Sequence, residues 1–432
     1  MLQALANAFK LRDLRGRILF TLGMLVVFRF AAHVPLPGVD LEGLRRIFET
    51  NQLLGMLNMF SGGAMMTFSI VALGTYPYIT AQIIIQLLQP IIPGLSELAQ
   101  EGEAGRQRLS LYTYLVTIPL AMLQAYTQAS LLARPQAGQT PVIANWGLGP
   151  GTWLPTVSVI LTLTAGTLFA VWLGQLIDER GIGNGISIII FGGIVAQMPQ
   201  NMVSLWVTNP WSLVLFAAIT VVTVVGIVYV QEGQRRIPVQ YAKRVRGTKM
   251  YGGQRVEIPL PVNSAGMIPL IFAVSILLLP GMVASYFVQS DVAWVASLSN
   301  VVARVFDSGS WSYWLMYFLM VVGLTYFYTD MVFEQQDLAG NLRKQGGAIV
   351  GYRPGKPTSS YLRGVLRRIT LVGALFLGVI AVLPFFMRLI TDTNVMLISS
   401  TGLLIVVGVV LDTMKQLEAQ LRMRHYEGFL KK

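Results

Sequence analysis

The chain has 432 residues but no cysteine, only two histidines, and a charged fraction of just 12%. Without cysteine, a disulfide framework and thiolate metal sites are both excluded. His33 and His425 lie at opposite ends of the chain and offer no metal-binding cluster. The GxSxG and HExxH motifs of hydrolases and metalloproteases are also missing. These absences argue against an enzyme and against a bound cofactor.

Charge is scarce because long stretches lack it altogether. No Asp, Glu, Lys or Arg occurs within 50–96, 109–133, 135–177, 181–231, 258–290, 308–329, 369–387 and 393–411. A helix needs about 20 apolar residues to cross a hydrocarbon core of ~30 Å. We therefore expect an all-α polytopic membrane protein. Its ten spans are predicted near 18–34, 64–92, 109–131, 153–177, 183–203, 211–231, 264–286, 311–332, 369–390 and 394–412.

The positive charges lie on alternate loops. If the N-terminus is on the inner side, the inner segments carry 26 of the 32 Lys and Arg residues. This asymmetry follows the positive-inside rule and predicts that both termini are cytoplasmic. Seven of the eight tryptophans then lie near the outer boundary, as an aromatic belt does. Arg29 is the charge within the first span, close enough to its outer end to snorkel.

The second predicted span is irregular. Gly62 and Gly63 open it, Gly74 interrupts it, and Pro77 suits the first turn of a new helix. We expect a short re-entrant half-helix near 64–72, followed by a full span from about 75 to 92. A single kinked span is the alternative. Non-helical backbone at membrane depth is tolerated only where protein or a cavity surrounds it.

Two inner loops are long and basic. Residues 232–263 and 333–368 each contain seven Lys or Arg residues. The first loop alternates like a strand at 237–241 and again at 255–258. Part of this charge sets topology and meets anionic lipid. Loops of this length also suit docking to an acidic partner, either RNA phosphate or an acidic protein surface.

Several motifs occur in order along the whole chain, and together they resemble the SecY family, the central channel subunits of the bacterial SecYEG translocase. The motifs are Phe60-Ser61-Gly62-Gly63-Ala64, Pro77-Tyr78-Ile79, Gln86-Leu87-Leu88, residues 101–106, 179–187, 233–239, 261–269, 351–355 and 424–428. The resemblance implies ten spans in two inverted, pseudo-symmetric halves of five, 1–203 and 204–432, around a central pore.

The resemblance also implies roles for particular residues. A plug at about 60–72 would comprise Phe60, Ser61, Gly62, Gly63, Ala64, Met65, Met66, Thr67, Phe68, Ser69 and Ile70. An apolar ring at the pore waist would comprise Thr75, Ile79, Ile190, Ile271 and Ile405; lipid contact or core packing is the alternative for each isoleucine. A lateral gate would be held shut by Thr80, Gln124 and Asn263, which would otherwise serve local capping or packing.

By the same resemblance, the chain would pass unfolded secretory polypeptides across the bacterial plasma membrane and release signal sequences and transmembrane helices sideways into lipid. Expected partners are the SecE and SecG subunits, the SecA motor ATPase, and the RNA and proteins of the ribosome at its exit tunnel. The docking residues would be Arg353, Lys243, Arg244, Arg255 and Lys356. A single copy and a homodimer both stay open. The alternative function is a secondary transporter of a small solute, which predicts a polar site at mid-membrane.

Overall fold

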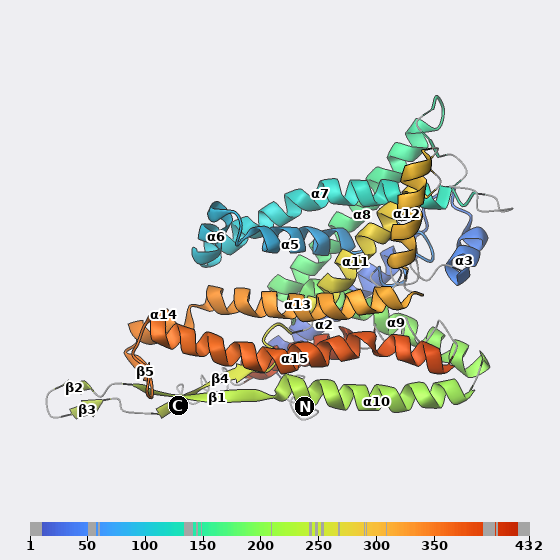
Figure 1. Cartoon of the computed structure of the whole chain (residues 1–432). Coiled ribbons are helices and arrows are strands. Elements are labelled where there is room, and N and C mark those ends of the chain that lie inside the picture. The colour runs from blue at the N-terminus through green and yellow to red at the C-terminus, as the bar shows by residue number, and fades with distance from the viewer. Residues whose placement is uncertain are drawn as a thin grey trace. The chain divides into compact units, whose positions relative to one another are not determined.

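A computed structural model shows a helical protein with a three-stranded sheet and a separate two-stranded sheet (Figure 1). It describes residues 11–50, 58, 61–133, 141–143, 146–147, 149–208, 210–241, 244–246, 249–251, 255–266, 268–288, 290, 292–307, 309–391, 402 and 405–421. The helices are α2 (Arg12–Ala31), α3 (Leu41–Thr50), α5 (Tyr76–Leu88), α6 (Pro93–Gln100), α7 (Glu103–Ala133), α8 (Trp153–Arg180), α9 (Gly185–Thr208), α10 (Pro210–Glu232), α11 (Ile268–Phe287), α12 (Ala293–Val305), α13 (Trp311–Gln336), α14 (Leu338–Lys344) and α15 (Lys356–Thr391). Residues 405–421 are helical as well. The strands are β1 (Gln234–Tyr241), β2 (Arg244–Arg246), β3 (Lys249–Tyr251), β4 (Arg255–Pro261) and β5 (Gly347–Ile349).

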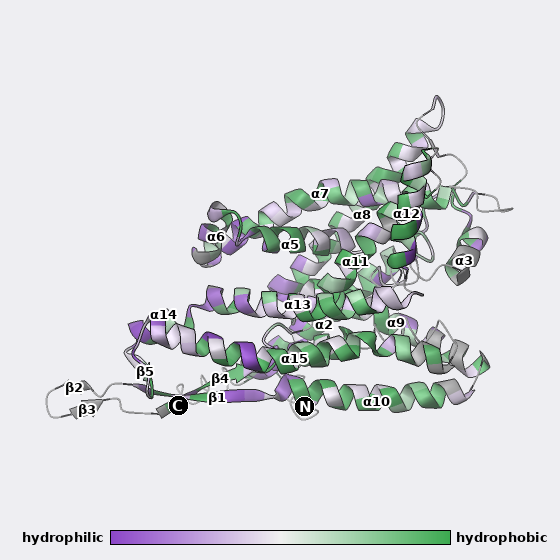
Figure 2. Cartoon of the chain, viewed as in Figure 1, coloured by the Kyte–Doolittle hydropathy of each residue, from purple (hydrophilic) through white to green (hydrophobic). Residues whose placement is uncertain are grey.

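Several helices are long and apolar enough to cross a membrane. Within the described residues five qualify: Glu103–Ala133, Trp153–Arg180, Leu213–Glu232, Trp311–Lys344 and Lys356–Phe386. The pair α5 and α6, bent by 104°, raises the number to six if it forms one broken span. The multi-pass membrane architecture is thus confirmed, while the count of ten spans stays a prediction. Figure 2 shows hydrophobic residues over most of α10 and α15, with hydrophilic residues on β1 and α14.

The chain divides into two compact units. The first contains Met1–Ala218, Val274–Trp314 and Pro384–Lys432, and the second contains Ile219–Ala273 and Leu315–Leu383. The predicted halves, 1–203 and 204–432, rest on an internal symmetry that this division does not test. They stay a prediction.

In the first unit, α5 packs on α7, α7 on α8, and α8 on α9, while α2 contacts both α8 and α9. Small residues allow the closest approaches. A Cβ on Gly185 would lie 1.9 Å from the carbonyl oxygen of Gly174, so only glycine fits where α9 begins beside α8. Such small-residue contacts are typical of helices packed in a membrane.

In the second unit, α15 packs against α10 and α13. A Cβ on Gly378 would lie 2.7 Å from the ring of Phe318 on α13, and one on Gly226 of α10 would lie 3.5 Å from the ring of Phe376. The three-stranded sheet has the order β4-β1-β5 and is antiparallel throughout. Its buried side packs on a cluster that includes Val239 and Leu362. The strand alternation predicted at 237–241 and 255–258 is confirmed, because these residues pair in β1 and β4.

The prediction of a half-helix near 64–72 is wrong. Residues 61–75 form consecutive turns with one isolated β-bridge, and the regular helix α5 begins only at Tyr76. The backbone has positive φ at Gly62, Gly63, Phe68 and Gly74, and positive φ interrupts an α-helix. The start of a new helix at Pro77 is confirmed, since this proline lies in the first turn of α5.

Candidate functional site

The turns of residues 61–75, called the turn segment from here on, are closed by local hydrogen bonds. The backbone amide of Met65 donates to the Ser61 hydroxyl at 3.1 Å, and the amide of Met66 donates to the Asn58 side-chain oxygen at 3.0 Å. The Ser61 hydroxyl donates in turn to the Asn58 carbonyl. Side chains of this type compete with helical bonding, so they stabilise turns in an apolar stretch that would otherwise be helical.

The chain that follows α2 holds the turn segment from one side. The amide of Leu36 donates to the Phe68 carbonyl and the amide of Ile70 donates to the Val34 carbonyl, both at 3.1 Å. The Thr67 hydroxyl donates to the carbonyl of Ala32 at 2.8 Å. These bonds satisfy backbone groups that would otherwise be buried without partners.

Helices α8 and α9 meet the turn segment from other directions. A Cβ on Gly166 of α8 would lie 1.8 Å from the Ile70 carbonyl oxygen, and a Cβ on Gly193 of α9 would lie 2.2 Å from the Gly62 Cα. Backbone therefore touches backbone at both places. Phe68 and Met65 are fully buried, with 0% exposure. The turn segment is a packed element inside the first unit, although it is not a helix.

The predicted ring residues are all buried. Thr75, Ile79, Ile190 and Ile405 belong to the first unit and are each at most 3% exposed. Ile271, at 8% exposed, lies on α11 within the second unit. Thr75 and Ile79 lie one helical turn apart, since the amide of Ile79 donates to the carbonyl of Thr75. Of the predicted plug and docking residues, Phe60 and Lys243 lie outside the described residues.

Two of the three predicted gate residues bond locally. The Thr80 hydroxyl donates to the carbonyl of Tyr76 within α5, and the Asn263 amide donates to the carbonyl of Gly266. Within the described residues the buried Gln124 amide on α7 has no hydrogen-bond partner. The structure thus gives Thr80 and Asn263 the local contacts that were the alternative to an interhelical bond. Their place in a gate stays a prediction.

A bond between helices occurs at a residue that the sequence reasoning did not select. The phenol of Tyr76, at the start of α5, donates to the carbonyl of Ser275 on α11 at 2.9 Å. Both residues belong to the first unit and are buried. The available signal was a tyrosine inside an apolar helix, because a buried phenol needs a hydrogen-bond partner.

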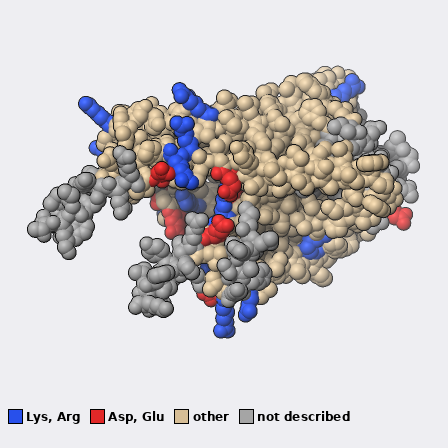
Figure 3. Space-filling model, turned by 90° about the horizontal axis from the view of Figure 1, so that it is seen from below, with Lys and Arg blue, Asp and Glu red and all other residues tan. Residues whose placement is uncertain are grey.

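The basic loop before α15 presents Arg353 and Lys356 to solvent. The loop turns at Gly351 and Gly355, both with positive φ. The hydroxyl of the buried Thr358 donates to the Arg353 carbonyl at 2.7 Å. Arg255 lies in β4 of the three-stranded sheet, and Arg244 lies in β2, which pairs with β3 in a separate two-stranded sheet. Figure 3 shows that most Lys and Arg side chains on the displayed face lie toward one end.

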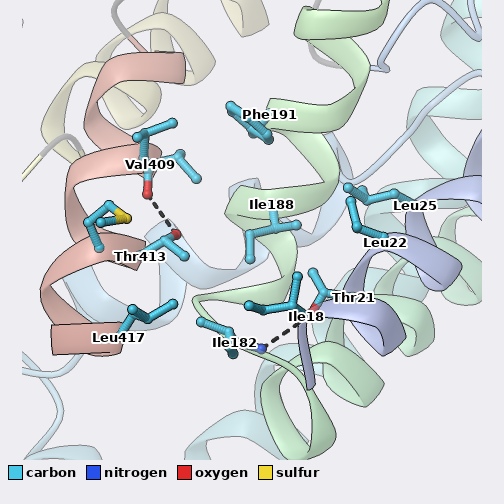
Figure 4. A pocket seen from close by; sticks show the side chains of 12 residues that line it. Ile18, Thr21, Leu22, Leu25, Ile182, Ile188, Phe191, Val409, Thr413 and Leu417 are labelled. Atoms are coloured by element: carbon cyan, nitrogen blue, oxygen red, sulfur yellow. Dashed lines mark hydrogen bonds between the residues drawn. The ribbon is translucent and has the colours of Figure 1, made fainter. Parts of the chain in front are cut away.

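An apolar pocket of about 260 Å³ lies between α2, the start of α9 and the helix 405–421 (Figure 4). Its only polar side chains are Thr21 and Thr413. The Thr413 hydroxyl donates to the Val409 carbonyl, and the Thr21 hydroxyl accepts from the Ile182 amide. The mostly aliphatic lining suits contact with an aliphatic group. Within the described part of the chain, no group of three His, Asp or Glu residues could hold a metal ion.

Comparison with known proteins points to one family. Residues 69–414 match the family model described as SecY. The chain is 41% identical over 443 residues to the "Protein translocase subunit SecY" of Thermotoga maritima, covering 100% of this chain and 98% of the relative. It is 43% identical over 452 residues to the protein of the same description from Halalkalibacterium halodurans, covering both chains completely.

Solved structures agree on the fold. One is described as the plug domain of the SecY protein stabilising the closed state of the translocation channel and maintaining a membrane seal; it matches with a TM-score of 0.62 at 16% identity, over 94% of this chain and 92% of the other. The other is described as "Sec61 in the Canine ribosome-channel complex from the endoplasmic reticulum" and has the same TM-score, identity and coverage.

Proposed function

Because the chain belongs to the SecY family, it is a protein-conducting channel of a membrane translocase, and we propose how its residues carry out that role. The similarities give no support to the alternative of a small-solute transporter. The observation that carries the proposal is the turn segment: a stretch of non-helical backbone, mostly buried, that packs against the chain after α2 and against α8 and α9. Non-helical backbone in a membrane protein is tolerated where protein surrounds it.

We assign the turn segment as the plug of the resting channel. The relative described as having a plug that maintains a membrane seal supports this assignment by its fold. We assign the apolar ring of the pore, as the family resemblance implies it, to Thr75, Ile79, Ile190, Ile271 and Ile405. An apolar constriction excludes water when it is empty, and its flexible side chains adapt to a passing polypeptide without sequence preference.

We assign α5, α7 and α11 to the lateral gate. The bond from Tyr76 to the Ser275 carbonyl joins α5 to α11 and closes this gate. Of the other gate residues, Thr80 lies on α5, Gln124 lies on α7, and Asn263 lies in the loop before α11. Single hydrogen bonds between membrane helices contribute roughly 0.6–2 kcal/mol. An apolar signal sequence can therefore displace the bond and leave the channel sideways into lipid.

The two basic loops dock the cytoplasmic partners. Arg353, Lys243, Arg244, Arg255 and Lys356 meet the ribosome during synthesis and the SecA motor ATPase afterwards, with Arg353 the main motor contact. The canine relative is described in a ribosome-channel complex, which supports the ribosome as a partner. SecE and SecG are the small membrane subunits. Both termini are cytoplasmic, the halves 1–203 and 204–432 are inverted repeats, and the working unit is one copy or a homodimer.

Site-specific crosslinking tests the channel directly, because the chain has no cysteine of its own. One cysteine replaces Ile79, and a second is placed in a secretory polypeptide stalled during export. A crosslink that appears only when the stalled polypeptide is long enough to reach Ile79 supports the proposal. If the polypeptide is engaged but never crosslinks at any length, the waist has been assigned to the wrong residues.

A further inference from the structure

Arg29 contacts the turn segment. It lies in the last turn of α2 and is half-buried, between the buried Phe28 and the exposed Phe30. Its guanidinium group donates a hydrogen bond through Nη1 to the carbonyl oxygen of Gly62. An ionised side chain within a membrane span is costly, and such residues usually have a defined partner and a function. Snorkelling alone does not account for a guanidinium directed at a backbone carbonyl 33 residues away.

We propose that Arg29 is the positioning residue that latches the plug in its closed place, through its bond to the Gly62 carbonyl. This inference rests on the proposed function, because it takes the turn segment to be the plug. The latch is formed while the channel rests. It is broken when the plug leaves, and Arg29 is then hydrated in the opened channel.

The backbone of Gly62 is arranged for this contact. Its φ of +68° is accessible to glycine with little strain and interrupts a right-handed helix at this residue. A Cβ at Gly62 would also lie 2.9 Å from the Cα of Gly193 and 3.2 Å from the ring of Phe28. Gly62 is therefore held between α2 and α9, with its carbonyl presented to Arg29.

Some buried polar groups around the plug destabilise its closed position. In the described residues, Ser69 Oγ, Thr75 Oγ1 and Gln197 Nε2 are buried and have no hydrogen-bond partner. A buried polar group without a partner destabilises the state that buries it. A charge-assisted bond is stronger than a neutral one, so the Arg29 bond offsets part of this cost. Losing the bond should shift the closed-to-open balance by at least about tenfold.

Cysteine accessibility in the otherwise cysteine-free chain measures that balance. Ala64 in the plug and Ala170 on α8 are both 0% exposed. The full-length chain carrying Ala64→Cys is reconstituted in lipid nanodiscs and treated with a water-soluble maleimide. We expect Arg29→Leu to accelerate labelling at position 64 by about tenfold or more. Labelling of the Ala170→Cys reference should not change.

Two further variants separate a latch from a general loosening. Arg29→Lys keeps a charged donor and should restore slow labelling at position 64. Arg304→Leu removes an exposed arginine from α12 and should have no effect. Unchanged labelling at position 64 in Arg29→Leu overturns the latch, and so does an equal increase at position 170. If Arg29→Leu accelerates labelling but a plug deletion does not leak ions, the latch holds and the sealing role is wrong.

Discussion

Gly193 of α9 and Gly62 of the turn segment touch through their backbones, so closely that a Cβ on Gly193 would lie 2.2 Å from the Cα of Gly62. No flexible side chain lies between them to absorb an added methyl group. The position of the turn segment is therefore coupled directly to the side-chain size at position 193.

Gly193→Ala should displace the turn segment and raise the resting ion conductance of the channel. Overpacking of this kind costs about 1–3 kcal/mol, which is enough to populate an unsealed state. Recordings in planar bilayers without substrate measure this resting conductance. Gly192→Ala is the matched control, because its Cβ would meet the side chain of Leu25, nearest at the terminal Cδ2, and no backbone atom is among its nearest contacts. Equal leakage from both variants would contradict a specific contact with the plug.

Deletion of residues 62–70 should leave a channel that inserts into the membrane but leaks ions at rest. Most of the deleted residues are buried inside the first unit, and their loss opens the space that they fill. Bilayer conductance without any substrate is the measurement. A resting conductance equal to that of the intact chain would show that this segment is not the seal.

Tyr76→Phe should make the lateral gate easier to open. The change removes the hydroxyl that donates to the Ser275 carbonyl and keeps the aromatic ring, at a cost of about 1 kcal/mol. We expect secretory substrates with a shortened apolar signal to be exported several-fold better, as measured by protease protection in vesicles. Tyr78→Phe is the control, since that ring lies 5.5 Å from the Tyr114 ring on α7, on the same side of the gate. Identical export by both variants would argue against the Tyr76 bond.

Arg353→Glu should abolish most SecA-driven export while leaving insertion of the channel itself intact. The exposed side chain is reversed in charge, so an acidic docking partner is repelled instead of attracted. ATP-dependent translocation into vesicles is the assay. Arg304→Glu, the same charge reversal on exposed α12, should export normally. Full export by Arg353→Glu would remove this residue from the docking surface.

Thr358→Val should reduce SecA-driven export by a smaller factor than Arg353→Glu does. The hydroxyl of Thr358 is buried and its bond to the Arg353 carbonyl is worth about 1 kcal/mol, so its loss loosens the loop without changing any charge. Thr358→Ser keeps the donor and should retain most of the activity. The readout is the SecA concentration needed for half-maximal export. No change in that concentration would mean that the loop shape does not limit docking.

Much of the architecture could be read from local patterns. Uncharged stretches predicted the long helices because each is long and apolar enough to cross a bilayer, and alternation at 237–241 predicted β1 because strand side chains repeat every two residues. Pro77 correctly marked the start of α5. Each of these features depends on residues close together in the chain.

The turn segment depends on more distant contacts. Its apolar composition predicted a half-helix, but Asn58 and Ser61 close turns there, and Gly166 and Gly193 admit its backbone against α8 and α9. Tyr76 and Arg29 likewise acquired their partners, the carbonyls of Ser275 and Gly62, from remote parts of the chain. Every residue has a backbone carbonyl, so the sequence does not show which carbonyl will accept a hydrogen bond from a distant side chain. The sequence by itself determined the multi-pass membrane architecture, the basic loops and the family. Only the tertiary structure decided which buried polar groups meet, because that depends on packing across the fold.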